Sequence, residues 1–96
     1  PDAVVVCHRP NHPFRYPRGV VDEIRAILSL IPNVKIAAVS LNPKNLGEPL
    51  EDYARRLQGR VWRALGSRVP VRDPVRESEE LARDVLRALG LEGRGT

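Results

Sequence analysis

The chain has 96 residues, which makes one small domain, and 42% of them are hydrophobic, which is enough for a core. No apolar run approaches the ~20 residues of a membrane span and no signal peptide is visible, so the composition argues against a membrane protein and favours a cytoplasmic one. One cysteine excludes a disulfide within the chain, and the net charge of +4, carried by 14 Arg and 2 Lys against 12 acidic residues, admits an anionic partner.

The first predicted strand is Ala3–Cys7, a short run rich in valine. Residues 8–19 then form an irregular loop, because its prolines lack backbone donors and constrain their neighbours: Pro10, Pro13 and Pro17. Cys7, His8 and His12 are potential metal ligands, but they give at most three donors in one loop and no second Cys/His pair follows. We therefore expect no metal site, with Cys7 a buried strand residue and His8 a polar group at the strand end.

An amphipathic helix is predicted over Val20–Ile31, and Pro32-Asn33 ends it. Its apolar positions fall on one face: Val20, Ile24, Ile27, Leu28 and Ile31. The stretch Val34–Asn45, VKIAAVSLNPKN, is nearly unbroken in its apolar character up to Asn42-Pro43, where the chain must turn. Such a run, without polar alternation, is typical of a strand buried on both faces, so we predict the central strand of the sheet here.

The second helix is predicted from Pro49, which suits a first helical position, to Gly66, a natural C-cap. Its apolar residues trace one stripe: Leu50, Tyr53, Ala54, Leu57, Val61, Ala64 and Leu65. Trp62 is expected to be partial core or a subunit contact. Acidic residues open this helix and the last one while arginines follow, which complements the helix dipole. We interpret most of these arginines as a solvated helix face.

Arg68–Arg72 is the predicted third strand, and Pro70 inside it argues for an edge position or a very short strand. A last helix follows, capped at Ser78 and ended by Gly90, and residues 91–96 are predicted to be a flexible tail. The order β-α-β-α-β-α predicts an α/β fold with a parallel sheet in three layers, like P-loop or Rossmann domains.

Parallel strands joined by right-handed crossovers point the same way, so the loops after all three predicted strands open on one edge of the sheet. Open α/β sheets bind ligands at that carboxyl edge. The edge gathers five polar residues that we predict to line one ligand pocket: His8, Arg9, Asn42, Asp73 and Arg76. Asn42 offers an amide for a nucleotide base edge, Arg76 a fork for a carboxylate or phosphate, and Asp73 an acceptor that can orient an arginine. The plainer interpretations are that Asn42 forms a turn and that Asp73 pairs with Arg76 across another.

Three strands and three helices leave little to cover both faces of a sheet whose central strand looks fully buried. We therefore expect a larger sheet, completed by a missing N-terminal segment or by another subunit, and self-association or marginal stability of the chain by itself. The sequence begins at Pro1 and contains no methionine, and we expect it to be a piece of a longer protein. It contains neither a G-x-x-x-x-G-K-[ST] phosphate loop nor a G-x-G-x-x-G between a strand and a helix.

Nucleic acid is the disfavoured partner. Phe14 and Tyr16 alternate with Arg15 and Arg18 in the first loop, a pattern that can stack on bases and neutralise phosphates. Only this one short loop has it, so the sequence favours a small anionic ligand or a nucleotide over RNA or DNA.

Four strings in this order resemble the C-terminal part of a P-loop protein family, long of unknown function, that includes D-glutamate N-acetyltransferase-like proteins. The strings are DAVVVCHRP from Asp2, VKIAAVSLNPKNL from Val34, VPVRDPVR from Val69 and SEELARDVLRAL from Ser78. The resemblance covers nearly the whole chain, and its most specific pieces are the Asn at the strand end and the P-V-x-D-P-V-R string. It implies a dethiobiotin-synthetase-like nucleotide-binding fold, in which Asn42 lies near the base and the later proline-containing loop lies beside it.

The same resemblance implies a function. Residues 1–90 would be the C-terminal portion of a P-loop-like domain and would form the base side of a nucleotide site in a D-glutamate N-acetyltransferase-like protein. ATP or another nucleotide would be its ligand, and acetyl-CoA a further one. The family's phosphate loop belongs to an earlier segment that is not in this sequence, so we do not expect the chain by itself to be active. The alternative is a non-enzymatic α/β module that binds an anionic partner such as RNA through basic carboxyl-edge loops.

Overall fold

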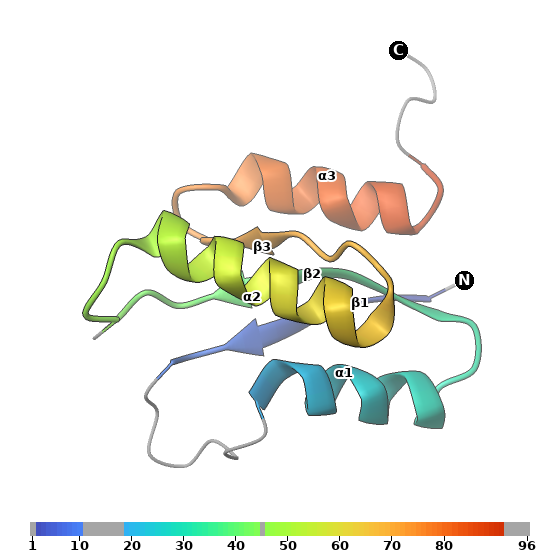
Figure 1. The fold of residues 1–96 in the computed structure, drawn as a ribbon. Helices are drawn as coiled ribbons and strands as arrows, with labels where there is room; N and C mark the ends of the chain where they lie inside the picture. The colour runs from blue at the N-terminus through green and yellow to red at the C-terminus, as the bar shows by residue number, and fades with distance from the viewer. Residues whose placement is uncertain (1, 11–18, 45, 92–96) are drawn as a thin grey trace.

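The six predicted elements are present, in the predicted order, in a computed structural model of the chain (Figure 1). The structure describes residues 2–10, 19–44 and 46–91. The elements are β1 Asp2–His8, α1 Gly19–Leu30, β2 Val34–Leu41, α2 Leu50–Leu65, β3 Val71–Arg72 and α3 Ser78–Ala88. The greater part of the predicted loop, residues 11–18, and the predicted tail from residue 92 lie outside the described residues.

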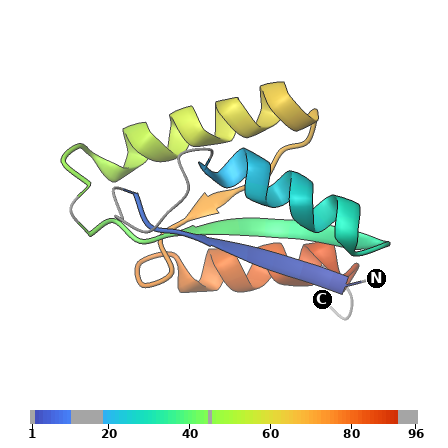
Figure 2. The same ribbon diagram turned by 90° about the horizontal axis from the view of Figure 1, so that it is seen from below.

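The three strands form one parallel sheet in the order β1-β2-β3, so β2 is the central strand, as predicted. β1 pairs with β2 along its full length, with one irregularity in register between Val4 and Val5. Helices α1 and α2 cover one face of the sheet and α3 covers the other (Figure 2). This is the predicted three-layer α/β arrangement.

The main core lies between the sheet and the layer of α1 and α2. Its buried side chains come from the strands, from these two helices and from the approach to β3: Val6, Val20, Ile24, Val39, Leu41, Leu57, Val61, Val69 and Val71. Within β2, Ala38, Val39 and Leu41 have no exposed surface. The expectation that the central strand lacks cover is therefore wrong for the C-terminal half of β2, where strands flank it and helices lie on both of its faces. A further segment or subunit that extends the sheet stays a prediction.

β3 is shorter than the predicted strand Arg68–Arg72 and consists of Val71–Arg72 alone. Pro70 has no N–H to donate to a sheet, but its carbonyl oxygen accepts a hydrogen bond of 2.8 Å from the Val39 backbone nitrogen. β3 pairs only with Val39 and Ser40, near the C-terminal end of β2, so the N-terminal half of β2 has no strand beside it on this side among the described residues. The edge position predicted from Pro70 is confirmed.

Cys7 is exposed, and the prediction that it is buried is wrong. Its neighbour Val6 points into the core, so the alternation of side chains along a strand turns Cys7 towards the opposite face. On that face α3 lies mainly over β2 and less over the edge strand β1. The edge of the sheet therefore leaves this thiol accessible.

Helix α1 is buried only in its first half. Val20 and Ile24 are buried as predicted, but Leu28 and Ile31 remain 44% and 40% exposed. The first half packs against the sheet beside α2, whereas in the second half Ile27 still packs against the core but Leu28 and Leu30 are exposed. The helical period alone predicted a single apolar face and could not indicate where its cover ends.

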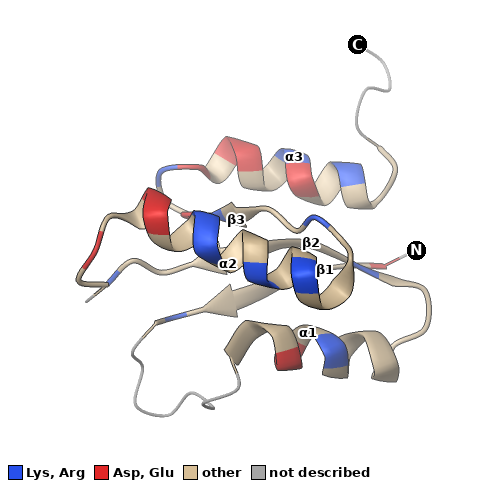
Figure 3. Ribbon diagram, viewed as in Figure 1, with Lys and Arg blue, Asp and Glu red and all other residues tan. Residues whose placement is uncertain are grey.

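The helices carry the predicted order of charges, with acidic residues in the first turns of α2 and α3 and arginines later (Figure 3). Pro49 is the residue before α2 rather than its first, and Gly66 ends the helix in the left-handed conformation with φ 69°. Among the described residues, none of the helices has the length and apolar character that crossing a membrane requires.

Candidate functional site

The ends of the three strands lie along one edge of the sheet, which we call the carboxyl edge. His8 ends β1, Asn42 follows β2 and Asp73 follows β3. The backbone nitrogen of Asn42 donates a hydrogen bond of 2.9 Å to the carbonyl oxygen of His8, so the first two strand ends are in direct contact. Arg72 is in register with Ser40, so Asp73 emerges at the same edge. A single pocket lined by all five predicted residues stays a prediction.

His8 is joined to α2 through Tyr53. The imidazole Nε2 and the phenol oxygen lie 2.9 Å apart, and the two rings stack with centroids 6.0 Å apart. Burial raises the pKa of Tyr53 above its ordinary 10.0, since desolvation disfavours the phenolate, while the positive charge of Arg60 acts in the opposite direction. The helical stripe of α2 predicted Tyr53 only as a core residue, and no local spacing indicates a contact between two residues that are 45 positions apart.

Asn42 is half-buried and forms the turn that Asn-Pro sequences favour. Its side-chain Oδ1 accepts a hydrogen bond of 3.0 Å from the backbone nitrogen of Lys44. This bond fixes which end of the amide is engaged by the protein. The Nδ2 group is then the donor that the side chain can offer to a ligand.

Asp73 is buried, with 4% of its surface exposed, and organises the loop before α3. Its Oδ1 accepts hydrogen bonds from the backbone nitrogens of Val75 at 2.9 Å and Arg76 at 3.3 Å. In return, the backbone nitrogen of Asp73 donates to Glu77 Oε1 at 3.0 Å, as in a capping box with one extra residue. The carboxylate therefore contacts the backbone of Arg76, and within the described residues it makes no hydrogen bond or ion pair with the arginine side chain that it was predicted to orient.

Both predicted arginines of the carboxyl edge, Arg9 and Arg76, are exposed. Arg76 borders a hollow of about 400 Å³ between the start of α2 and the loop after β3, together with Glu51 and Glu77. The other four predicted residues are not among those that line this hollow. The structure thus places all five residues along one edge but brings only Arg76 into this cavity.

A comparison with protein families matches most of the chain, including all three strands of the sheet. Residues 1–82 match the P-loop domain of DUF1611_C, a domain described as being of unknown function. The chain belongs to this family. The predicted resemblance to a P-loop family is thereby confirmed. No curated protein and no solved structure gives a significant match to the chain.

The DUF1611 domain has no evident metal centre in its described part. Within residues 2–10, 19–44 and 46–91, no three His, Cys, Asp or Glu side chains come together as a metal site would require. The third ligand considered from the sequence, His12, lies outside these ranges.

A buried ion pair in the DUF1611 domain, which the sequence did not predict, joins β3 to α3. The Arg72 Nε donates to Asp84 Oδ2 at 2.8 Å, and Nη2 donates to Oδ1 at 3.2 Å. The hydrogen bond to Asp84 raises the pKa of Arg72 above its already high ordinary value. The signal that could have indicated this pair is the position of Asp84, three residues after Leu81 on the inner side of α3.

Proposed function

We propose that this DUF1611 domain forms the base side of a nucleotide-binding site, with Asn42 in contact with the base. The observation that carries the proposal is the hydrogen bond between the backbones of Asn42 and His8. It holds the Asn42 side chain at the edge where open α/β sheets bind their ligands. Membership of a P-loop family supports a nucleotide, such as ATP, as the ligand class.

The groups at the carboxyl edge have distinct parts in this proposal. Because Oδ1 of Asn42 is held by Lys44, Nδ2 donates to an acceptor on the base. The stacked rings of His8 and Tyr53 stiffen the end of β1 beside it. Asp73 shapes the neighbouring loop through its backbone contacts. The phosphates would be held by a phosphate loop outside this sequence, which contains no G-x-x-x-x-G-K-[ST] string.

An enzymatic role for the longer protein is supported by the resemblance of this chain to D-glutamate N-acetyltransferase-like proteins. We propose that the site belongs to a longer cytoplasmic protein of the D-glutamate N-acetyltransferase-like kind, with acetyl-CoA as acyl donor. The residues of this chain would then contribute binding rather than the chemical step, because none of the five edge residues is set up as an activated nucleophile by a contact in the described structure.

A nuclear magnetic resonance titration of the chain with adenosine and with ATP tests this proposal. We expect both ligands to shift the backbone signals of His8, Asn42 and Lys44. Asn42→Asp keeps an acceptor for the Lys44 backbone but loses the amide donor, so it should bind adenosine about tenfold more weakly while its melting temperature changes little. Adenosine is the decisive ligand because it carries no charge that an added carboxylate would repel.

Two results would count against a base site at Asn42. One is unchanged affinity for adenosine in Asn42→Asp, and the other is a set of shifted signals that avoids the carboxyl edge. A salt-resistant complex with random single-stranded RNA would instead favour the module that binds nucleic acid, because non-specific phosphate contacts are normally lost as salt rises.

A further inference from the structure

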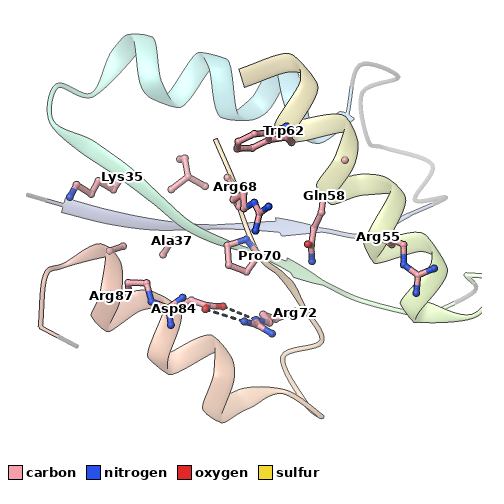
Figure 4. A pocket seen from close by; sticks show the side chains of 14 residues that line it. Lys35, Ala37, Arg55, Gln58, Trp62, Arg68, Pro70, Arg72, Asp84 and Arg87 are labelled. Atoms are coloured by element: carbon pink, nitrogen blue, oxygen red, sulfur yellow. Dashed lines mark hydrogen bonds and ion pairs between the residues drawn. The ribbon is translucent and has the colours of Figure 1, made fainter. Parts of the chain in front are cut away.

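A groove of about 800 Å³ runs along the β3 side of the sheet, between α2 and α3 (Figure 4). Its apolar lining comes from the N-terminal half of β2 and from the approach to β3: Ile36, Ala37, Val69 and Pro70. The groove extends to Lys35, near the start of β2, whereas Asn42 follows the end of this strand. Asn42 lies seven residue positions beyond Lys35, which along an extended strand corresponds to about 23 Å. The far end of the groove therefore lies away from the proposed base site, while its near end, at Arg55 and Arg72, borders the hollow that Arg76 lines.

This groove gathers the excess positive charge of the chain. Its basic residues come from both flanking helices, from two strands and from the approach to β3: Lys35, Arg55, Arg68, Arg72 and Arg87. Asp84 is the one acidic residue among those that line it. These are five of the 16 Lys and Arg and one of the 12 Asp and Glu, so the rest of the chain carries eleven of each and is formally neutral. A set of unrelated solvated helix faces does not account for this distribution.

Two of the arginines are held in place by neighbours. The Arg68 guanidinium lies over the Trp62 ring, 5.6 Å from its centroid, and Trp62 remains 49% exposed. Arg72 is fixed by its two hydrogen bonds to Asp84 (Figure 4). Side chains that are ordered before binding lose less entropy when a ligand arrives. Arg55, in contrast, is 80% exposed and reaches Asp52 only at 4.0 Å, so it can turn towards a ligand.

We propose that this groove binds a small molecule that carries two or more phosphate groups. Its volume falls within the roughly 300–1,000 Å³ of small-molecule sites. Each phosphate group carries about 1.5 to 2 negative charges at neutral pH, so two of them match the four excess positive charges of the lining. Carboxylates would need four groups in the same space. Guanidinium groups also bind phosphate oxygens in a bidentate manner, which suits a lining in which four of five cations are arginines.

Tripolyphosphate, which has no base, tests the groove independently of the nucleotide proposal. Trp62 is the single tryptophan of the chain and lines the groove, so its fluorescence reports on occupancy directly. We expect tripolyphosphate to change this fluorescence in a saturable manner at low salt, and added salt to weaken binding by screening. Calorimetry should give the affinities of variants, because a change at Arg68 alters the surroundings of Trp62 itself.

The double variant Arg55→Gln and Arg68→Gln should bind tripolyphosphate about tenfold more weakly or worse, because it loses two charged donors. Arg83→Gln removes one charge from the exposed side of α3, outside the groove, and should stay within about twofold of the unaltered chain. Circular dichroism should show all these variants folded. Asn42→Asp should also bind normally, which separates this site from the carboxyl edge.

Several outcomes would overturn the proposal. Absence of heat and of a fluorescence change would exclude the site, and so would normal binding by the double variant. Loss of binding in Asn42→Asp would place the anion at the carboxyl edge instead. Citrate that binds as tightly as tripolyphosphate would contradict the assignment to phosphate. A short single-stranded oligonucleotide that binds far more tightly, and through Arg55 and Arg68, would make the groove a nucleic-acid surface.

Discussion

The two members of the Arg72–Asp84 ion pair should tolerate substitution unequally. The Asp84 side chain is 1% exposed, whereas that of Arg72 is 27% exposed and also has Glu77 within 3.4 Å. Arg72→Met would leave a carboxylate without a counter-ion inside the protein, which costs about 3–5 kcal/mol. Asp84→Asn keeps one acceptor for the guanidinium, which can also reach water and Glu77, so we expect a cost of about 1–2 kcal/mol.

These differences are large for a domain of this size. At about 0.05–0.15 kcal/mol per residue, 96 residues give a total stability of about 5–14 kcal/mol. Urea denaturation followed by circular dichroism measures the free energy of unfolding of each variant, and equal m-values would show that the transitions are comparable. Arg83→Met is the control, because Arg83 is an exposed arginine of α3, the helix that carries Asp84. Its free energy of unfolding should stay within about 0.5 kcal/mol of that of the unaltered chain.

The double variant Arg72→Met and Asp84→Leu completes the test. Replacing a buried pair by apolar side chains of similar volume is often neutral, so this variant should recover most of the stability that Arg72→Met loses. If Asp84→Asn costs as much as Arg72→Met, the unequal burial of the two partners does not decide the outcome. If the double variant is no more stable than Arg72→Met, the unpaired carboxylate is not the source of the loss.

Two further predictions concern single residues of α2 and its cap. The raised pKa of Tyr53 means that its contribution to stability is fully present below pH 10.0 and is lost as the pH rises through the higher folded value, so Tyr53→Phe should remove this alkaline loss. The chain also contains Tyr16, so the tyrosinate absorbance of Tyr53 is the difference between the unaltered chain and Tyr53→Phe, and its midpoint should lie above pH 10.0. Two glycine-to-alanine changes should have opposite signs in thermal unfolding. Gly66→Ala should cost about 1–2 kcal/mol because φ is 69° there. Gly59→Ala, inside the helix, should stabilise the chain by about 0.5–1 kcal/mol, since the nearest atom to its new Cβ is the end of the Arg63 side chain at 4.0 Å. A loss of stability in Gly59→Ala, or no loss in Gly66→Ala, would contradict the assigned conformations.

The order of elements was predictable because each has a clear period and clear breakers. The apolar run of β2, the helical stripes and the proline in β3 each indicate one structure, and together they leave one parallel arrangement. The errors occur where burial depends on neighbours in space. Cys7 resembles the valines before it in sequence, yet it lies on the less covered face of an edge strand. Leu28 fits the stripe of α1 and is exposed because the cover ends before it.

The candidate site was predictable only as far as topology reaches. Strand direction placed His8, Asn42 and Asp73 at one edge, and the structure has them there. Strand direction could not indicate that the Asp73 carboxylate accepts hydrogen bonds from the backbone of its own loop, because those bonds depend on the path of the chain into α3. The contact of His8 with Tyr53 depends likewise on how α2 lies over the end of β1.

The groove shows why charge on a helix cannot be interpreted from the helix alone. Arg55 on α2 and Arg87 on α3 each follow acidic residues in their own helix, so each looks like part of a solvated face that complements the dipole. The two helices cover opposite faces of the sheet, and their arginines meet only around the open side of β3, which Pro70 and the short strand leave without a further partner in the described structure. The short β3 strand with Pro70 before it, which leaves this side of the sheet without a further strand in the described structure, thus also leaves room for the groove.

A network of hydrogen bonds and ion pairs connects this groove to the carboxyl edge, and it determines which substitutions can test each site separately. Arg72 bonds to Asp84 in the wall of the groove and to Glu77, and Glu77 accepts a hydrogen bond from the backbone of Asp73 at the carboxyl edge. Any change at Arg72 therefore disturbs the stability of the domain and both surfaces together. Arg68 has no contact with this network in the described structure and lines the groove but not the hollow beside Arg76, so a loss of anion binding on its substitution reports on the groove, whereas Arg55 lines both.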